Sequence, residues 1–240
     1  YLDEFFEVYR ENYDLKKALE EFAFVMENAM EEAVERVKED AVFPAKIDGK
    51  YVKENIEKKI FFWLVNTENN KELLETVPHR GFLDLSIVYS LLYEKDGTVY
   101  GSSMLTNPML SLLKMEEEQL FSMAKANTEK VLPTVVRSMA EGMVMVTNRP
   151  QYRGASVLMN DTVLSSLADA IQDDLYIMPA SIDEVVIVPV SFTDDVSVLQ
   201  QMVKVANETC LSLDELLSNE VYYYSKKERK VFLATCPKEA

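Results

Sequence analysis

Glycine, cysteine, histidine and tryptophan are all scarce in this chain of 240 residues. It contains 6 glycines, 2 cysteines, 1 histidine and 1 tryptophan. Because glycines are so few, neither a dinucleotide-binding fingerprint nor a Walker A loop is present. A single histidine excludes a multi-histidine metal site, and we expect neither a metal nor another cofactor.

The two cysteines, Cys210 and Cys236, form neither a disulfide framework nor a metal-ligand spacing. This usage fits a reducing compartment, so we expect a cytoplasmic location. No run approaches the ~18 to 20 apolar residues that a membrane-spanning helix needs. No signal peptide heads the sequence. A start at Tyr1 rather than at methionine indicates an excised fragment or a processed product.

Basic residues are outnumbered, since 41 acidic side chains face 25 lysines and arginines and the net charge is −16. The first 40 residues hold 13 acids and 5 bases, which is half of the excess. Such a negative field repels phosphate backbones and anionic lipids. We therefore expect neither direct nucleic-acid binding nor membrane binding.

Hydrophobic residues make up 48% of the chain, enough to form a substantial core. Residues 15–37 place apolar side chains at steps of three and four, which predicts a long amphipathic helix. Residues 60–66 are apolar without alternation, which predicts a strand covered on both faces. Residues 84–93 and 99–106, joined through Asp96-Gly97, predict a hairpin.

The rest of the chain predicts short elements in close succession. Helices are predicted from Asn107, over residues 115–127, from Asn160 or Asp161, and over residues 195–209. Ser212 and Glu215 fit a capping box that would start another helix. The stretch through Met139 is expected to be helical or irregular. Strands are predicted at residues 144–147, 155–159, 175–178, 185–190, 221–224 and 231–234.

The spacing between these strands is too short for repeated parallel crossovers, which favours antiparallel pairing. We predict an α+β fold with mixed, mainly antiparallel sheets and with helices packed on one side. Two lobes are expected. Residues 1–142 would hold a helical segment and a three-stranded α/β unit, and residues 143–240 a second α/β unit, within two domains or one continuous domain.

Three stretches carry a resemblance: FFWLVNTENNKELLETVPHRGFLDLSIVYSLL, DLYIMPASIDEVVIVPV and SNEVYYY. Together they resemble a bacterial family classed only as domain of unknown function 5688, which is common in anaerobic gut bacteria. The resemblance covers most of the chain, from about Tyr1 to Tyr224. No activity is established for that family, so the resemblance implies no catalytic residue.

His79, Arg80 and Asp84 form the first candidate site. In an enzyme, His79 would be a general base oriented by Asp84, and Arg80 would bind an anionic substrate. The structural alternative is a loop before a strand, with Arg80 paired to one of many acids. We favour the structural alternative because motif matches of this kind are often false.

Polar residues at predicted turns form the other weak candidates. Ser181 lies beside Asp183 and Glu184, but no nucleophile elbow surrounds it, so this stretch is typical of a turn. The acidic pairs 173–174, 183–184 and 194–195 adjoin strand or helix ends, where acids commonly cap helices and form turns.

Tyr222, Tyr223 and Tyr224 form an unusual aromatic run. In a strand, Tyr222 and Tyr224 point to one face of the sheet and Tyr223 to the other. If exposed, Tyr222 and Tyr224 would form an interaction surface. The alternative, which we favour, is a sheet whose two faces are both partly covered.

The leading functional hypothesis is a non-enzymatic, cytosolic interaction or regulatory module with an unidentified protein partner. One alternative is an enzyme that uses His79, Arg80 and Asp84. Another is an acidic decoy that occupies the basic nucleic-acid-binding surface of a partner protein. The oligomeric state stays open.

Overall fold

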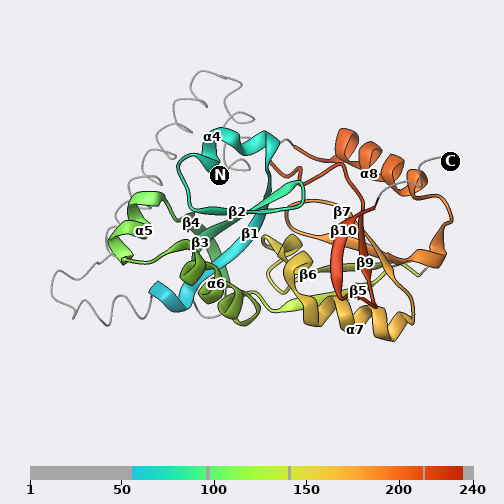
Figure 1. The fold of residues 1–240 in the computed structure, drawn as a ribbon, viewed down its shortest axis with the longest axis horizontal. Coiled ribbons are helices and arrows are strands. Elements are labelled where there is room, and N and C mark those ends of the chain that lie inside the picture. Colours follow the sequence, from blue (N-terminus) through green and yellow to red (C-terminus); the bar gives the residue numbers. More distant parts are fainter. Residues whose placement is uncertain (1–55, 96–97, 140–141, 213, 235–240) are drawn as a thin grey trace, which may run out of the picture. The chain divides into compact units, whose positions relative to one another are not determined.

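The computed structural model describes residues 56–95, 98–139, 142–212 and 214–234. The chain divides into two compact units, residues 1–52 and 53–240, and every described residue belongs to the second (Figure 1). The helix predicted over residues 15–37, the acidic first forty residues and the Asp96-Gly97 turn lie outside the described residues. In the described part of the chain, no helix is long and apolar enough to cross a membrane.

The first sheet has four antiparallel strands: β1 (Ile60–Asn66), β2 (His79–Phe82), β3 (Leu85–Lys95) and β4 (Thr98–Met104). β3 is central, with β1 on one edge and with β2 and β4 paired to successive parts of the other edge. The pairing of β3 with β4 confirms the predicted hairpin strands. Every residue from Ile60 to Val65 is buried, as expected for a strand covered on both faces.

Helical segments cover both faces of this sheet. They are η1 (Glu68–Asn70), α4 (Lys71–Leu74), α5 (Asn107–Leu113) and α6 (Glu117–Val131). Leu120 and Ala124 of α6 share a core cluster with Phe62. Leu74 of α4 joins a different cluster with Trp63, on the opposite face. The predicted helices from Asn107 and near residues 115–127 are therefore confirmed.

The second sheet has six strands: β5 (Thr134–Ser138), β6 (Val144–Asn148), β7 (Leu175–Pro179), β8 (Val185–Pro189), β9 (Tyr222–Ser225) and β10 (Lys230–Leu233). Their order is β10-β9-β7-β8-β6-β5, and all pairs are antiparallel. Two antiparallel sheets combined with helices confirm the predicted α+β class.

Two helices flank the second sheet on opposite faces, α7 (Asp161–Ile171) and α8 (Val196–Cys210) (Figure 1). Leu164 of α7 shares a cluster with Ile177, whereas Leu199 of α8 shares a cluster with Met178. We expected helices on one side. Both faces are covered here because β7 and β8 are apolar at successive positions, so each face needs a cover.

Both helices begin where the sequence predicts. The Asn160 side chain accepts a hydrogen bond from the Val163 amide at 3.2 Å, and the Asp195 side chain accepts one from Ser197 at 2.9 Å. Such bonds satisfy amides that the first helical turn leaves unpaired. A short 3-10 turn, η3 (Val190–Phe192), precedes α8.

Three local predictions are wrong. Residues 155–159 form no strand but lie in a 3-10 helix, η2 (Gly154–Met159), because a continuously buried run carries no period that separates strand from helix. Residues 134–138 are the edge strand β5, not helical or irregular. Glu215 accepts hydrogen bonds from the Ser212 amide and hydroxyl, which is half of a capping box, but residues 214–215 form a turn and no helix follows; Leu217 and Ser218, just beyond it, are buried.

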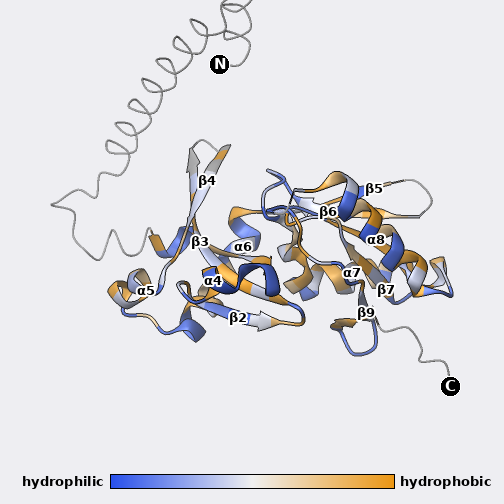
Figure 2. Cartoon of the chain, turned by 90° about the horizontal axis from the view of Figure 1, so that it is seen from above, coloured by the Kyte–Doolittle hydropathy of each residue, from blue (hydrophilic) through white to orange (hydrophobic). Residues whose placement is uncertain are grey.

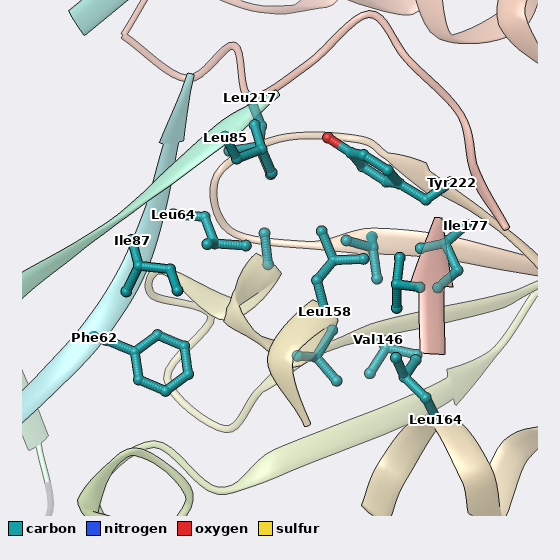
Figure 3. Close-up of a cluster of buried hydrophobic side chains, with 14 of the residues drawn as sticks. Phe62, Leu64, Leu85, Ile87, Val146, Leu158, Leu164, Ile177, Leu217 and Tyr222 are labelled. Carbon is teal, nitrogen blue, oxygen red and sulfur yellow. The ribbon is translucent and has the colours of Figure 1, made fainter. Parts of the chain in front are cut away.

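The two sheets share one hydrophobic cluster, and η2 lies inside it (Figure 3). Phe62 and Leu64 come from β1, Val146 and Ile177 from the second sheet, and Leu158 from η2 between them. η2 contacts β1, β6, β8 and α7. The two sheets are therefore joined by one shared core, and each sheet has a further hydrophobic cluster on its other face.

Gly154, the first residue of η2, is held against its neighbours too closely for any side chain. A Cβ atom placed there would lie 2.3 Å from the Asp183 carbonyl oxygen and 2.5 Å from Thr147 Oγ1. Thr147 Oγ1 in turn donates a hydrogen bond to that same carbonyl at 2.7 Å. Glycine is thus required by close backbone approach.

We expect Gly154→Ala to lower the free energy of unfolding by at least about 2 kcal/mol, because the added methyl group meets backbone that cannot move aside. Chemical denaturation measures the change. Gly81→Ala is the matched control, since nothing lies within 4 Å of a Cβ there, and its stability should stay within about 0.5 kcal/mol of the parent. Equal effects of the two substitutions would contradict the close approach.

Candidate functional site

The structure separates the predicted catalytic pair. His79 is exposed at the start of β2, and its Nδ1 lies 3.1 Å from the Val77 carbonyl oxygen. Asp84 lies in the turn between β2 and β3, where Oδ1 accepts a hydrogen bond from the Tyr222 hydroxyl at 2.8 Å and Oδ2 one from Ser218 Oγ at 2.5 Å. His79 and Asp84 are therefore not brought into contact.

Arg80 is engaged in holding β2 against α6. Its Nε donates to Glu117 at 3.2 Å and its Nη2 at 2.6 Å, Glu118 also accepts from Nη2, and the guanidinium lies 4.2 Å from the centre of the Phe121 ring. The Glu117 hydrogen bond raises the pKa of Arg80 above its usual range. Because carboxylates already occupy this guanidinium, the structure supports the predicted ion-pair role.

Tyr222 and Tyr224 are fully buried, so they form no exposed interaction surface, and the covered sheet that we favoured is what the structure has. They lie on the face of β9 that joins the shared core, and Tyr223 points to the other face, as predicted. Burial, followed by the charge of Asp84, raises the pKa of Tyr222. The Asp84–Tyr222 and Asp84–Ser218 bonds thus tie the β2–β3 turn to the second sheet.

In the three acidic pairs, Asp173, Asp174, Asp183 and Asp195 accept structural hydrogen bonds. Asp173 accepts a hydrogen bond from the Ser191 amide at 2.9 Å, which holds its pKa below the usual range. Asp174 accepts from the Lys226 amide and the Tyr223 hydroxyl. Asp183 accepts from the Arg153 amide at 2.7 Å. Among the described residues, no group of three histidines, cysteines or carboxylates could hold a metal ion.

The outward face of α8 is the candidate interaction site. Val196, Leu199, Val203 and Asn207 are buried against the sheet. On the other side, Val198, Met202 and Val205 are 49%, 44% and 47% exposed and follow one another at steps of four and three. Residues so spaced line one face of a helix. Figure 2 shows that α8 carries hydrophobic as well as polar residues.

This row, defined here as the α8 face, carries no charge. The charged residues of α8 are Lys204 and Glu208, and Glu208 adjoins the end of the row, three residues after Val205. A helix on the surface of a globular protein normally places charged and polar residues outward. A partly apolar outward row on a chain of net charge −16 makes this helix the candidate interaction site.

Two of the cavities in the described residues lie away from α8. One of about 370 Å³ lies between α6, η2 and the start of α7, and includes Lys125, Glu129 and Asn160. Glu129 is occupied by hydrogen bonds from Thr134 and Asn160. The other, of about 440 Å³, lies beside Trp63 and Asn66. Neither cavity includes His79, Arg80 or Asp84.

The chain matches one known protein family over most of its length. The model of a family of unknown function, DUF5688, matches residues 1–145 and 140–226. The chain belongs to this family. No curated protein and no solved structure is detectably similar to it. DUF5688 membership confirms the resemblance predicted from the sequence.

The α8 face of this DUF5688 protein was not among the residues predicted from the sequence. Its signal is present, because apolar residues in α8 recur at two sets of helical positions, one led by Val196 and one by Val198. One helix cannot turn both sets to the same sheet. A second apolar set on one helix is therefore the pattern that could have indicated an interaction face.

We expect Asp84→Ala to lower the free energy of unfolding by about 3 kcal/mol, since two hydrogen bonds to a carboxylate are lost and the buried Tyr222 hydroxyl is left unpaired. Tyr222→Phe, which removes one bond and keeps the ring, should cost about 1 kcal/mol. Chemical denaturation gives both values. Asp194→Ala, at an exposed acid, is the control. If it lowered the free energy of unfolding as much as Asp84→Ala, the Asp84 hydrogen bonds would not be what stabilises the fold.

Alkaline pH should destabilise the fold. The hydrogen bond to Asp174 raises the pKa of Tyr223 from 10.0 to about 12. Because the folded state holds this proton more tightly, its stabilising contribution is complete below pH 10 and is lost as pH rises through 12. Stability measured over this window should fall more steeply in the parent than in Tyr223→Phe. Parallel slopes would show that Tyr223 does not contribute.

Proposed function

We propose that this protein is a non-enzymatic, cytosolic interaction or regulatory module that binds a partner protein through the α8 face. The uncharged row of Val198, Met202 and Val205 is the observation that carries the proposal. The inward positions of α8 already complete the core on that side of the sheet. The outward row therefore adds nothing to the fold and is available for binding.

The size of the row sets what the partner must supply. Fully burying one valine or methionine side chain stabilises by about 1.5–3 kcal/mol, so covering three half-exposed ones contributes about 2–4 kcal/mol in total. Association also costs translational and rotational freedom. The α8 face alone thus gives a weak complex, and contacts around it must add to the affinity.

Charge around the face indicates the nature of those contacts. Asp194 and Asp195 are exposed just before α8, and Glu208 is exposed near its end, whereas Lys204 is the single base of the helix. With a net charge of −16, the chain attracts a basic protein and repels a second copy of itself. The partner we propose presents an apolar, uncharged helix flanked by lysine or arginine. The acidic decoy hypothesis requires a basic partner too.

A photo-crosslinking amino acid at Met202 tests this proposal in cells of the native host. We expect one covalent adduct, with mass spectrometry locating the crosslink in an apolar helical segment flanked by basic residues. Met202 is 44% exposed, so the replacement leaves the core intact. Val205→Glu in the same protein should abolish the adduct, because burying an unpaired carboxylate against an apolar partner is unfavourable.

The same crosslinker at Leu112, which is 82% exposed on α5, is the matched control and should give no such adduct. Leu112→Glu should likewise leave the Met202 adduct unchanged. A crosslink from Met202 to a second copy of the chain, to an acidic protein or to nothing at all would overturn the proposal.

A further inference from the structure

Arg153 places its guanidinium over the ring of Trp63, the only tryptophan of the chain. Its guanidinium carbon is 3.8 Å from the centre of the Trp63 ring and 5.4 Å from that of Tyr152. Stacking of this kind holds a guanidinium in one plane and leaves its nitrogen edge free to donate. The geometry therefore presents Arg153 in a fixed orientation.

No acid neutralises this guanidinium in the part of the chain that the structure describes. The ion pairs there involve Arg80 and Arg229 among the arginines, and none involves Arg153. The nearby Asp183 carboxylate accepts from the backbone amide of Arg153 instead. Arg137 and Arg149 also lie outside these ion pairs, but both are exposed, whereas Arg153 is partly buried and stacked.

The guanidinium nitrogens differ in their surroundings. Nε is buried and has no hydrogen-bond partner, at a cost of about 1–3 kcal/mol. The terminal nitrogens are not among the buried unpaired atoms of the described residues, and the Arg153 residue as a whole is partly exposed. Their two parallel N–H groups match the oxygens of a carboxylate or a phosphate.

The loop that carries Arg153 is rigid and strained. Gln151 and Arg153 both have a φ of 55°, a conformation that costs non-glycine residues energy and recurs at binding sites. Both side-chain ends of Asn148 bond to the backbone of Tyr152, at 2.6 and 3.0 Å. Gly154 then fixes the end of the loop against Asp183. Arg153 is thus positioned before any ligand arrives.

Trp63 also lines a cavity of about 440 Å³, but Arg153 is not among the residues that line it. Its polar walls are the asparagines Asn66, Asn69 and Asn70 together with one acid, Asp214. Amide side chains both donate and accept hydrogen bonds. Both ends of the Asn66 amide are already bonded within the protein, so the contact that this region offers a ligand is the one that Arg153 makes with a single anionic group.

We propose that Arg153, stacked on Trp63, is a binding site for a single carboxylate or phosphate group of a small molecule. The site is separate from the α8 face and does not depend on it. Arg80 shows what the fold does with a structural arginine, since two glutamates pair with it. Arg153 has the same stacked geometry, and the ligand supplies the missing acid.

Fluorescence of Trp63 reports on this site without interference, because no other tryptophan is present. The full chain is titrated with sodium acetate and, separately, with sodium phosphate, at an ionic strength kept constant with sodium chloride. We expect a saturable change with half-saturation in roughly the millimolar range for an isolated charged group. Response to acetate alone assigns a carboxylate ligand, and response to phosphate alone a phosphate ligand.

Arg153→Gln should weaken the response at least tenfold, and Arg153→Lys, which keeps the charge but not the paired N–H groups, should weaken it less. Arg149→Gln removes an exposed charge from the same loop and should leave the response unchanged. Thermal unfolding of Arg153→Lys, compared with that of the parent, shows whether this variant is folded. The absence of a saturable change, or an equal change in Arg153→Gln, would overturn the site.

Discussion

The close approach of Gly154 to the Asp183 carbonyl is the contact on which the described structure depends. It sets η2 between the two sheets, where Leu158 joins the side chains of both in one core. The loop that precedes η2 places the Arg153 guanidinium over the Trp63 ring. A single backbone contact thus positions the shared core and the stacked arginine together. The Asp84 bonds to Tyr222 and Ser218 add a second tie between the same two sheets.

Much of this fold could be predicted because local signals and tertiary packing agree. The buried run of β1, the caps at Asn160 and Asp195 and the β9–β10 pairing follow from residue pattern and capping chemistry. η2 and β5 could not be predicted. The first is an apolar run without a period, and the second is an exposed edge strand whose pairing with β6 is decided by tertiary contacts.

The candidate sites were harder to predict than the fold, for a physical reason. His79, Arg80 and Asp84 are close in sequence, yet β2 and its turn direct His79 to solvent and Asp84 to Tyr222. Arg153 and Trp63 are distant in sequence and meet only because η2 lies between the sheets. The α8 face follows from helical periodicity alone. Sites built by long-range packing leave no local pattern, whereas faces of single helices do.

The dependence of both sheets on one core is tested most directly by native-state hydrogen exchange in increasing denaturant, followed by mass spectrometry. Peptides from β3 and from β7 report on the two sheets separately. If η2 joins the sheets into one cooperative unit, the central amides of β3 and β7 lose protection together, with the same opening free energy. Loss of protection in one sheet at clearly lower denaturant than in the other would contradict the shared core.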